Sequence, residues 1–457
     1  MSFFIETYGF RAINVFFFIF FIFTDIVCYF SLSTLISSFS FFLDKHAGGY
    51  AEDISEEQFD LLKKFLAKCP ADQVEEMRFP SEPVLYFGCR ILRARKYDLA
   101  EALKLVQLTS TWRREKRVRA IAENDPYEIL GISEDELLFY YPKTYFPLPD
   151  AEGRPIYAEK GGLADVEAMM MLVDGDMAKM VDYHIYGNEM YMRNLFGEMT
   201  VRASKPIHTI TTIMDMEGMS MKMIGSLSTS YIAAMIGIDK EHYPETLGKM
   251  IFINVPSFFS IGFAMIKPFL DERTVRKIEI LAGPSEWKPK LTELIGANNL
   301  PIEFGGKCEV KGGIYPKSRT QDSLLRIGKV MNVFAEAKMG ETIRFKWFCR
   351  PADICMGVSF VPAKALPPIS STPETSTDVI LPKSPGELVV KEIVDHPGSD
   401  TKFIEDTHKA PEDGYFVACF DNRKGWYDRH VYHRFDKMIE VKGKLRPECA
   451  VKSSSSS

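Results

Sequence analysis

Two short apolar segments that flank a helical one constrain the fold of this chain more than any other feature. Residues 209–216 and 249–256 are rich in apolar and β-branched residues on both alternating faces, as in strands that are covered on two sides. A helical stretch, 219–235, lies between them. Strands that alternate with helices in this way pair in parallel through crossover connections. The central part of the chain is therefore expected to be an α/β domain.

The segment 258–270 follows these strands and carries apolar side chains around nearly its whole circumference. Of the 22 methionines in the chain, 16 lie between Met169 and Met265. Methionine is flexible and polarizable, so it suits a wall that adapts to an apolar guest of loose shape. Ordinary core packing is the alternative interpretation, because methionine also fills gaps in cores that bind nothing.

Composition and charge argue against several classes of function. A length of 457 residues suggests about two to four domains, and the formal net charge of −6 argues against a general nucleic-acid binder. The eight cysteines are scattered singly, which indicates thiols in a reducing compartment. No motif for nucleotide binding, metal binding or a catalytic nucleophile is found, so no metal, no cofactor and no enzymatic activity are expected.

Residues 12–43 contain one charged residue, Asp25, and are long enough to cross a bilayer. Three interpretations stay open for this stretch: a membrane-anchoring helix, a cleaved signal peptide, or an extension that is absent from the mature protein. Residues 1–50 are therefore treated as a hydrophobic extension or membrane anchor, separate from the domains that follow.

The period of the apolar residues divides the remaining chain into three regions. Residues 52–124 predict a bundle of short helices, with Ser55 and Asp98 as N-terminal caps. Residues 125–312 predict the mostly parallel α/β domain. Residues 320–443 alternate apolar and polar side chains with a period of two, which predicts an all-β sandwich.

Further elements and two irregular segments complete this organisation. Within the α/β region we expect strands at 154–161 and 277–283, and one helix over 169–196. Residues 362–386 are rich in Pro, Ser and Thr, which favours a mobile loop inside one sandwich, with a linker between two domains as the alternative. Residues 444–457 are expected to be a disordered tail.

Several motifs resemble those of one known family. The segment LRARKYDLAEALKLVQLTSTWR is similar to the helical N-terminal element of CRAL-TRIO lipid-transfer proteins. The motifs GRPIYAEKGG, TIMDMEGMS, HYPETLGKMIFINVPSFFSIGFAMIKPFLDERTVRKIEIL and NNLPIEFGGKCEV follow in the order of the family, and the resemblance covers residues 59–310. The all-β region, with GETIRFKWFCRPADICMGVSF and GYFVACFDNRKGWYDRHVYH, resembles a GOLD β-sandwich. Together they resemble the CRAL-TRIO–GOLD carriers of phosphoinositides, tocopherol-like lipids and sterol precursors.

The resemblance implies that the segment 258–270 is a gate helix over a lipid cavity. Its apolar side chains would line the cavity when the gate is closed and would meet acyl chains when it opens. A buried core helix is the alternative, because a helix that is apolar all round needs either burial or a membrane. The implied gate residues are Phe258, Phe259, Ile261, Phe263, Met265 and Ile266.

The resemblance also implies a site for a phosphoinositide headgroup, which needs cations and a hydroxyl group. The position after Glu245 is usually basic in phosphoinositide binders and is Thr246 here, which puts this assignment in question. The implied headgroup residues are Arg95, Lys96, Glu245, Thr274 and Lys277.

A second implied pocket, for a phosphatidylcholine-type headgroup, is lined by Tyr145, Tyr157 and Thr212. The serine that the family has two residues before Thr212 is Ile210 here. An apolar residue at that position suits a more hydrophobic guest, such as a tocopherol, a sterol precursor or a retinoid. The ligand class therefore stays open between a phospholipid and an isoprenoid-like lipid.

Two groups of polar residues have alternative interpretations. Asp215 is expected to cap a turn, and His430 and His433 are not expected to bind a metal because they point to opposite faces of a strand. A basic run at the end of a predicted helix either docks on an anionic membrane or complements the helix dipole. This run comprises Arg113, Arg114, Lys116, Arg117 and Arg119.

Three hypotheses for the function follow. The first is a non-enzymatic protein that binds a hydrophobic lipid and transfers it between membranes, in the cytoplasm and peripheral to membrane surfaces. The alternative is a membrane-tethered trafficking or signalling adaptor whose GOLD sandwich binds protein partners. A hydrolase or isomerase that acts on a bound lipid is the third.

Overall fold

The computed structural model describes residues 51, 53–351, 354–365, 374–377, 388–396, 402–441 and 443–450. The apolar stretch 12–43 lies outside this part of the chain, and so does most of the predicted loop 362–386. No helix among the described residues is both long enough and apolar enough to span a bilayer.

The chain forms two compact units, and each is assembled from more than one segment. The first unit comprises the chain up to Asn124, Lys143–Leu163 and Val181–Tyr315, and the second comprises Asp125–Pro142, Ala164–Met180 and the chain from Pro316 onward. One break in this division falls at the expected boundary between residues 124 and 125, and the last one, after Tyr315, falls close to the expected boundary at residue 312. Two segments of the expected α/β domain belong instead to the unit that contains the sandwich.

Short helices open the first unit, as the sequence predicts. Ser55 forms a capping box with Gln58 at the start of the first described helix. The Asp98 carboxylate accepts a hydrogen bond from the backbone N–H of Glu101, at 3.0 Å, at the start of another. The helices are α3 (Glu56–Lys68), α4 (Ala71–Met77), α5 (Val84–Ala94), α6 (Leu99–Lys116) and α7 (Val118–Glu123). Buried apolar residues of α3, α5 and α6, such as Phe65 and Phe87, form one cluster.

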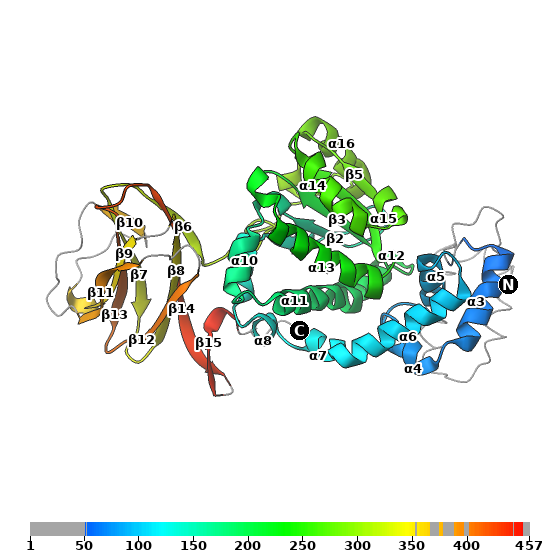
Figure 1. Ribbon diagram of the computed structural model, residues 1–457, viewed down its shortest axis with the longest axis horizontal. Helices are drawn as coiled ribbons and strands as arrows, with labels where there is room; N and C mark the ends of the chain where they lie inside the picture. The colour runs from blue at the N-terminus through cyan, green and yellow to red at the C-terminus, as the bar shows by residue number, and fades with distance from the viewer. Residues whose placement is uncertain are drawn as a thin grey trace, which may run out of the picture. The chain divides into compact units, whose positions relative to one another are not determined.

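A five-stranded sheet is the centre of the first unit (Figure 1). Its order is β1-β2-β3-β4-β5, with β1 antiparallel to β2 and the other neighbours parallel. The strands are β1 (Lys143–Tyr145), β2 (Ile156–Glu159), β3 (Ile210–Asp215), β4 (Leu247–Ile253) and β5 (Ile278–Ile280). The expected α/β domain is therefore confirmed in the form of a mixed sheet with helices.

The remaining helices of this region differ from the predicted ones at two places. The helix predicted over 169–196 is interrupted, because Asp174 and Gly175 both have positive φ angles, of 57° and 77°. The helix predicted over 219–235 begins only at Ser226, after a 3₁₀ turn at Met221–Met223. The elements are α10 (Val166–Leu172), which belongs to the second unit, α11 (Met177–Met190), a π-helical turn (Tyr191–Leu195), α12 (Phe196–Ala203), α13 (Ser226–His242), α14 (Phe259–Ile266), α15 (Glu272–Arg276) and α16 (Pro284–Ile295), with 3₁₀ turns at Gly161–Leu163, Lys267–Phe269 and Ile302–Phe304.

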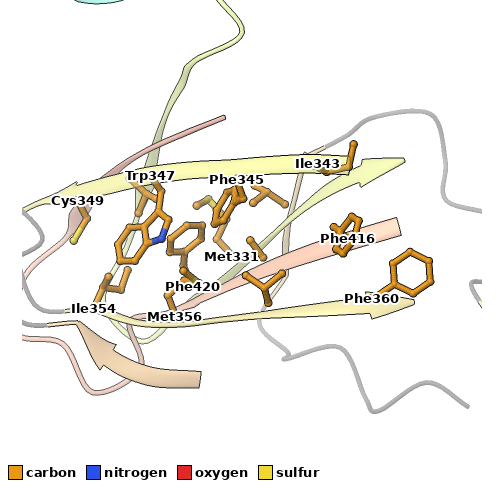
Figure 2. Close-up of a cluster of buried hydrophobic side chains, with 14 of the residues drawn as sticks. Met331, Ile343, Phe345, Trp347, Cys349, Ile354, Met356, Phe360, Phe416 and Phe420 are labelled. Carbon is orange, nitrogen blue, oxygen red and sulfur yellow. The ribbon is translucent and has the colours of Figure 1, made fainter. Parts of the chain in front are cut away.

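Two antiparallel sheets form the sandwich of the second unit, in the orders β10-β7-β13-β9-β11 and β12-β8-β14-β15, with β6 also paired to β14. The strands are β6 (Gln321–Leu325), β7 (Val330–Ala337), β8 (Thr342–Arg350), β9 (Ile354–Pro362), β10 (Glu374–Thr377), β11 (Leu388–His396), β12 (Ile404–Lys409), β13 (Gly414–Asp421), β14 (Arg429–Val441) and β15 (Lys444–Pro447). Trp347, Phe345, Phe360 and Phe420 are buried in the core between the sheets (Figure 2). Strands from both sides of the segment 362–386 pair with each other, so this segment lies within one sandwich and does not link two domains.

The disordered tail expected from residue 444 is wrong for its first residues. Residues Lys444–Pro447 form β15, which pairs with Met438–Val441 of β14. Gly443 supplies a positive φ of 76° at the turn between these strands. The Arg446 guanidinium forms ion pairs with Asp125, at 3.3 Å, and with Glu128. These contacts fix a segment whose composition alone shows no preference for a strand.

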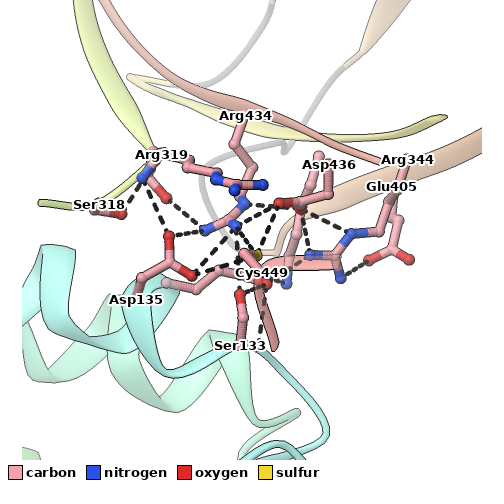
Figure 3. A network of polar contacts seen from close by, with 12 residues as sticks. Ser133, Asp135, Ser318, Arg319, Arg344, Glu405, Arg434, Asp436 and Cys449 are labelled. Atoms are coloured by element: carbon pink, nitrogen blue, oxygen red, sulfur yellow. Dashed lines mark hydrogen bonds and ion pairs between the residues drawn. The ribbon is translucent and has the colours of Figure 1, made fainter. Parts of the chain in front are cut away.

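Ion pairs join two short helices to the sandwich within the second unit, and Figure 3 shows the network at the second of them. These helices are α8 (Pro126–Leu130) and α9 (Glu134–Tyr140). The carboxylate of Glu136 contacts Arg344 at 2.6 Å and Lys346 at 2.9 Å, and all three side chains are buried. Burial alone would raise the pKa of Glu136, but the charges of Lys346 and Arg344 lower it. These ion pairs explain why residues 125–142 belong to the sandwich unit.

Candidate functional site

The two faces of the sheet in the first unit are covered differently. On one face, Ile156, Ile213 and Ile251 are fully buried and cluster with Trp287 and Leu291 of α16. Successive side chains of a strand point to opposite faces. On each strand, the residues directly before and after these isoleucines therefore face the other side of the sheet, where several side chains are only half-buried. This second face carries the residues that the sequence analysis assigns to a lipid pocket.

One cross-strand row on this face brings three of the predicted pocket residues together. In register, Tyr145 pairs with Tyr157, Tyr157 with Thr212, and Thr212 with Met250. The rings of the two tyrosines are 5.0 Å apart between centroids. Both tyrosines are half-buried, whereas Thr212 is buried. Ile210, the fourth predicted residue, is buried in the cluster that the two tyrosines border.

A carboxylate stands beside this row and was not among the predicted residues. Glu159 follows Tyr157 by two positions on β2 and accepts a hydrogen bond from the Tyr157 hydroxyl, at 2.5 Å. Burial raises the pKa of the Tyr231 phenol, and the negative charge of Glu159 raises it further. Helix α13 thus brings Tyr231 near Glu159. The period of two along the predicted strand could have identified Glu159, but no local signal connects Tyr231 to this face.

Helix α14 covers the next part of the same face. The rings of Phe259 and Phe263 lie 5.1 and 6.1 Å from that of Phe252 on β4, between centroids. Ile261 and Met265 of the same helix are 51% and 41% exposed. The helix is therefore apolar both where it packs on the sheet and where it faces outward. A core helix would be covered on both sides, so this alternative is not supported.

The ends of the predicted gate segment differ slightly from the expectation. Phe258 is the residue that precedes α14, and Ile266 is its last, half-buried residue. The segment continues as a 3₁₀ turn in which Phe269 is 39% exposed. The exposed apolar surface thus extends beyond the helix itself.

Methionines contribute to this region, but they do not form one continuous wall. Several of them cluster with Phe252 and Phe259 beneath α14. By contrast, Met169 and Met170 belong to α10 and hence to the second unit. The methionines beside α14 are Met214, Met216, Met219 and Met250.

A group of cations surrounds Glu245 at the edge of the same sheet. Arg273 contacts the Glu245 carboxylate at 3.2 Å, Lys277 at 3.5 Å and Arg93 at 3.7 Å. The Lys277 ammonium also donates a hydrogen bond to the backbone carbonyl of Leu247, at 2.8 Å. Glu245 is only 8% exposed, so its charge is held close to these three cations. One carboxylate beside three cations leaves an excess of positive charge.

Some of the same cations contribute to the lowered pKa of a buried histidine. Burial lowers the pKa of His208 to about 3, and the charges of Arg93 and Arg90 contribute to this lowering. Arg90 itself is paired with the buried carboxylate of Glu82, at 2.7 and 3.0 Å. His208 is therefore neutral at physiological pH, and the excess charge comes from arginine and lysine.

Three of the predicted headgroup residues lie differently from the expectation. Arg95 ends α5 and donates to the backbone carbonyl of Ala94, at 3.1 Å, while Lys96 is exposed. No contact given by the structure for the described residues joins either side chain to Glu245. The Thr274 hydroxyl donates to Asp271 at 2.7 Å. The structure thus brings Glu245 and Lys277 together with Arg93 and Arg273, which the sequence analysis did not select.

The basic run at the end of α6 is engaged by carboxylates. Arg113 forms a bidentate pair with Glu189, at 2.7 and 3.0 Å, and is buried. Three others form ion pairs: Arg114 with Asp72, Lys116 with Asp182 and Arg119 with Glu76. Arg117 adopts the left-handed conformation that ends the helix. These contacts favour a structural role over a membrane-docking one.

The remaining polar candidates have structural roles. The Asp215 carboxylate accepts hydrogen bonds from the backbone of Glu217 and the side chain of Asn254, so it fixes a turn, as expected. On β14, His430 is exposed, whereas His433 is buried. Within the described part of the chain, no group of three or more His, Cys, Asp or Glu side chains could hold a metal ion.

Comparison with known proteins supports the resemblance found in the sequence. Residues 140–306 match the profile of the CRAL/TRIO domain. The chain is 37% identical over 224 residues to the Sec14 cytosolic factor of Schizosaccharomyces pombe, covering 49% of this chain and 75% of that protein. It is 34% identical over 242 residues to the phosphatidylinositol/phosphatidylcholine transfer protein SFH7 of Arabidopsis thaliana, covering 52% of this chain but only 43% of that protein.

Among solved structures, Sfh5 is similar, with 21% identity and a TM-score of 0.37 over 49% of this chain and 72% of that one. The sequence match to the Schizosaccharomyces pombe protein spans three quarters of its length, and the profile match at residues 140–306 includes the sheet, α14 and Glu245. The chain belongs to the CRAL/TRIO family.

Proposed function

We propose that the first unit binds one hydrophobic lipid and transfers it between membranes without catalysing a reaction. One observation carries the proposal: α14 is apolar on the side that packs on Phe252 and also on the side that exposes Ile261 and Met265. A lid over a lipid needs both surfaces, because it covers the lipid when closed and touches a bilayer when open. The Arabidopsis thaliana relative is named as a phosphatidylinositol/phosphatidylcholine transfer protein, which supports the same activity.

The energetics of an acyl chain favour binding against an apolar surface such as the cluster beneath α14. Each methylene removed from water contributes about 0.8 kcal/mol, so a chain of ordinary length is bound strongly by apolar contact alone. A carrier must also release its lipid, which requires the cover to move. Helix α14 has eight residues and is followed by a 3₁₀ turn, so it is a short element that could move without disrupting the sheet.

The cations around Glu245 are proposed to bind the phosphate of a phosphoinositide headgroup. A guanidinium group can donate two parallel hydrogen bonds to two oxygens of one phosphate, and a lysine ammonium adds a point charge. Arg93, Arg273 and Lys277 already share one carboxylate, so an incoming phosphate would compete with Glu245 for them. This competition would keep the affinity moderate, which suits a carrier that must release its lipid. Arg95, Lys96 and Thr274 remain predicted contributors.

The row of tyrosines is proposed to receive a different headgroup. A quaternary ammonium group binds against the faces of aromatic rings and is attracted by a nearby negative charge. This row supplies the rings of Tyr145, Tyr157 and Tyr231 and the carboxylate of Glu159. A phosphatidylcholine would fit this chemistry. Ile210 favours the other expected class, an isoprenoid-like lipid such as a tocopherol or sterol precursor.

Lipids that copurify with the chain would test the proposal and identify the ligand. Organic extraction of the purified protein followed by mass spectrometry should recover a stoichiometric lipid. A chain that carries no lipid, and takes up none from vesicles of phosphatidylcholine and phosphatidylinositol, would refute the carrier function.

The fold family of the sandwich and the cellular location of the protein are also proposed. The two antiparallel sheets of the second unit are compatible with a GOLD-like sandwich, which would recruit a membrane or a protein partner. We also propose that the protein works in the cytoplasm, peripheral to membranes. The tethered-adaptor alternative depends on residues 12–43, which lie outside the described chain.

A further inference from the structure

Two neighbouring turns form one end of the sandwich, here called the tip. They are residues 326–329, between β6 and β7, and residues 422–428, between β13 and β14. The strands that lead into them are paired at this end, because Leu325 is in register with Arg429 and Val330 with Asp421. The two turns therefore leave the sandwich side by side.

Hydrogen bonds fix the two turns to each other. The backbone N–H of Asn422 donates to the carbonyl of Lys329 at 3.0 Å, and that of Gly328 donates to the carbonyl of Asn422 at 3.1 Å. The Asn422 side chain, which is buried, donates to the carbonyls of Leu325 and Tyr427, at 3.2 and 2.9 Å. These hydrogen bonds give the two turns of the tip a defined backbone conformation.

Three large apolar side chains project from the tip into solvent. Trp426 is 87% exposed, Tyr427 is 65% exposed and Ile327 is 50% exposed. Single exposed apolar residues are ordinary, but a tryptophan this exposed beside two further apolar side chains marks an interaction site. The Arg429 guanidinium lies 5.8 Å from the centroid of the Tyr427 ring, and most of the surface of the Trp426 side chain faces solvent.

Cations accompany these side chains. Arg326, Arg423 and Lys424 are exposed within the same two turns. The acidic groups nearby are already engaged: Asp421 pairs with Arg423, and Asp428 accepts a hydrogen bond from the backbone N–H of Ile327 at 2.9 Å. The tip therefore presents exposed apolar side chains that are surrounded by a net positive charge.

We propose that this tip docks the protein on an anionic membrane surface. Trp and Tyr side chains favour the bilayer interface, and each nearby Lys or Arg adds attraction to anionic lipids. A protein partner fits less well, because an aromatic side chain offers at most roughly 250 Å². Two aromatic side chains and one isoleucine do not reach the roughly 800 Å² per partner that a stable protein interface buries. The proposal does not rest on lipid transfer by the first unit.

The exposed tryptophan is itself a reporter of this contact. The chain has four tryptophans, and the other three, Trp112, Trp287 and Trp347, are half-buried or buried. Vesicles of phosphatidylcholine with phosphatidylserine should therefore shift the emission of the full chain to shorter wavelength and protect it from an aqueous quencher. Vesicles of phosphatidylcholine alone should do so less. A Trp426→Phe variant should lose this spectral change.

Vesicle sedimentation with matched variants tests the tip directly. Trp426→Ala should weaken the partition to anionic vesicles by about tenfold, as expected for one large side chain. Met339→Ala is the control, because Met339 is 71% exposed at the opposite end of the same sandwich, between β7 and β8. Lys424→Gln should weaken binding more at low salt than at high salt, whereas Lys409→Gln, exposed at the opposite end, should not.

Two results would overturn the proposal. If Trp426→Ala and Met339→Ala bind vesicles equally well, the tip does not touch the bilayer. If anionic vesicles leave the tryptophan emission unchanged, the exposed side chains serve a protein contact instead. Lipid loading is measured separately, so a chain that fails to carry lipid could still dock through the tip.

Discussion

Ile261→Asp tests whether α14 enters a membrane during lipid exchange. Ile261 is 51% exposed in the closed arrangement, so an aspartate there keeps contact with water and should change the folded protein little. In bilayer hydrocarbon the same side chain costs about 2.5–3.5 kcal/mol. If exchange requires α14 in hydrocarbon, the rate should fall by on the order of a hundredfold. Transfer of a fluorescent phospholipid between donor and acceptor vesicles measures this rate.

A matched control makes the result decisive. Ile302 is 55% exposed in a 3₁₀ turn of the same unit, so Ile302→Asp makes the same chemical change away from α14. Its transfer rate and melting temperature should match those of the wild type. Phe263 is a less suitable position, because it packs against Phe252 and an aspartate there would also lower stability. Equal transfer rates for Ile261→Asp and Ile302→Asp would show that α14 is not the gate.

Three further outcomes are expected. Arg273→Ala should weaken phosphoinositide loading by roughly tenfold, the value of one charge-assisted hydrogen bond, whereas Arg95→Ala should weaken loading less, because the Arg95 side chain contacts its own backbone; the reverse order would favour the assignment that the resemblance implies. The pKa of His208 is about 3 in the folded protein, below its ordinary value of 6.5, so the unfolded chain binds more protons between these values. Stability should therefore fall by up to about 1.4 kcal/mol per pH unit below pH 6.5. His208→Gln should flatten this slope in urea titrations, and an unchanged slope would contradict it. Glu136→Gln should lower the free energy of unfolding by about 3–5 kcal/mol, because the buried Lys346 loses its ion pair with Glu136, whereas Arg344 keeps Asp436; a loss no larger than that of Glu405→Gln, a more exposed carboxylate of the same unit, would contradict this.

Features set by local chemistry could be predicted from the sequence. Ser55 and Asp98 cap helices because their side chains satisfy backbone N–H groups within three residues. The strands β3 and β4 lie within the predicted segments or overlap them closely, because apolar β-branched runs of that length have few other stable states. Tyr145, Tyr157 and Thr212, which the resemblance assigns to one pocket, lie in one cross-strand row, antiparallel between the two tyrosines and parallel between Tyr157 and Thr212.

The cation site was predicted only in part, for a geometric reason. Arg93 and Arg95 are two residues apart at the end of α5, and two residues on a helix are separated by about 200°. Arg93 therefore points inward to Glu245, whereas Arg95 ends the helix with its side chain on its own backbone. The sequence shows both arginines but not the angle at which α5 meets the sheet. That angle is set by packing among the first helices, which no local pattern encodes.

The boundaries between modules were the least predictable feature, because long-range ion pairs determine them. The chain passes between the two units five times, so no single linker separates them. Glu136 and Asp135 come from α9, yet their partners Arg344 and Arg434 lie on strands of the sandwich. A sandwich cut from the chain at residue 316 would keep Asp436 beside Arg344 and Arg434, but it would lose Glu136, the ion-pair partner of the buried Lys346, which is strongly unfavourable. The unit that contains the sandwich thus includes residues that lie before and inside the CRAL/TRIO match at 140–306. A fragment whose ends are chosen from the sequence motifs would therefore lack part of the packed unit.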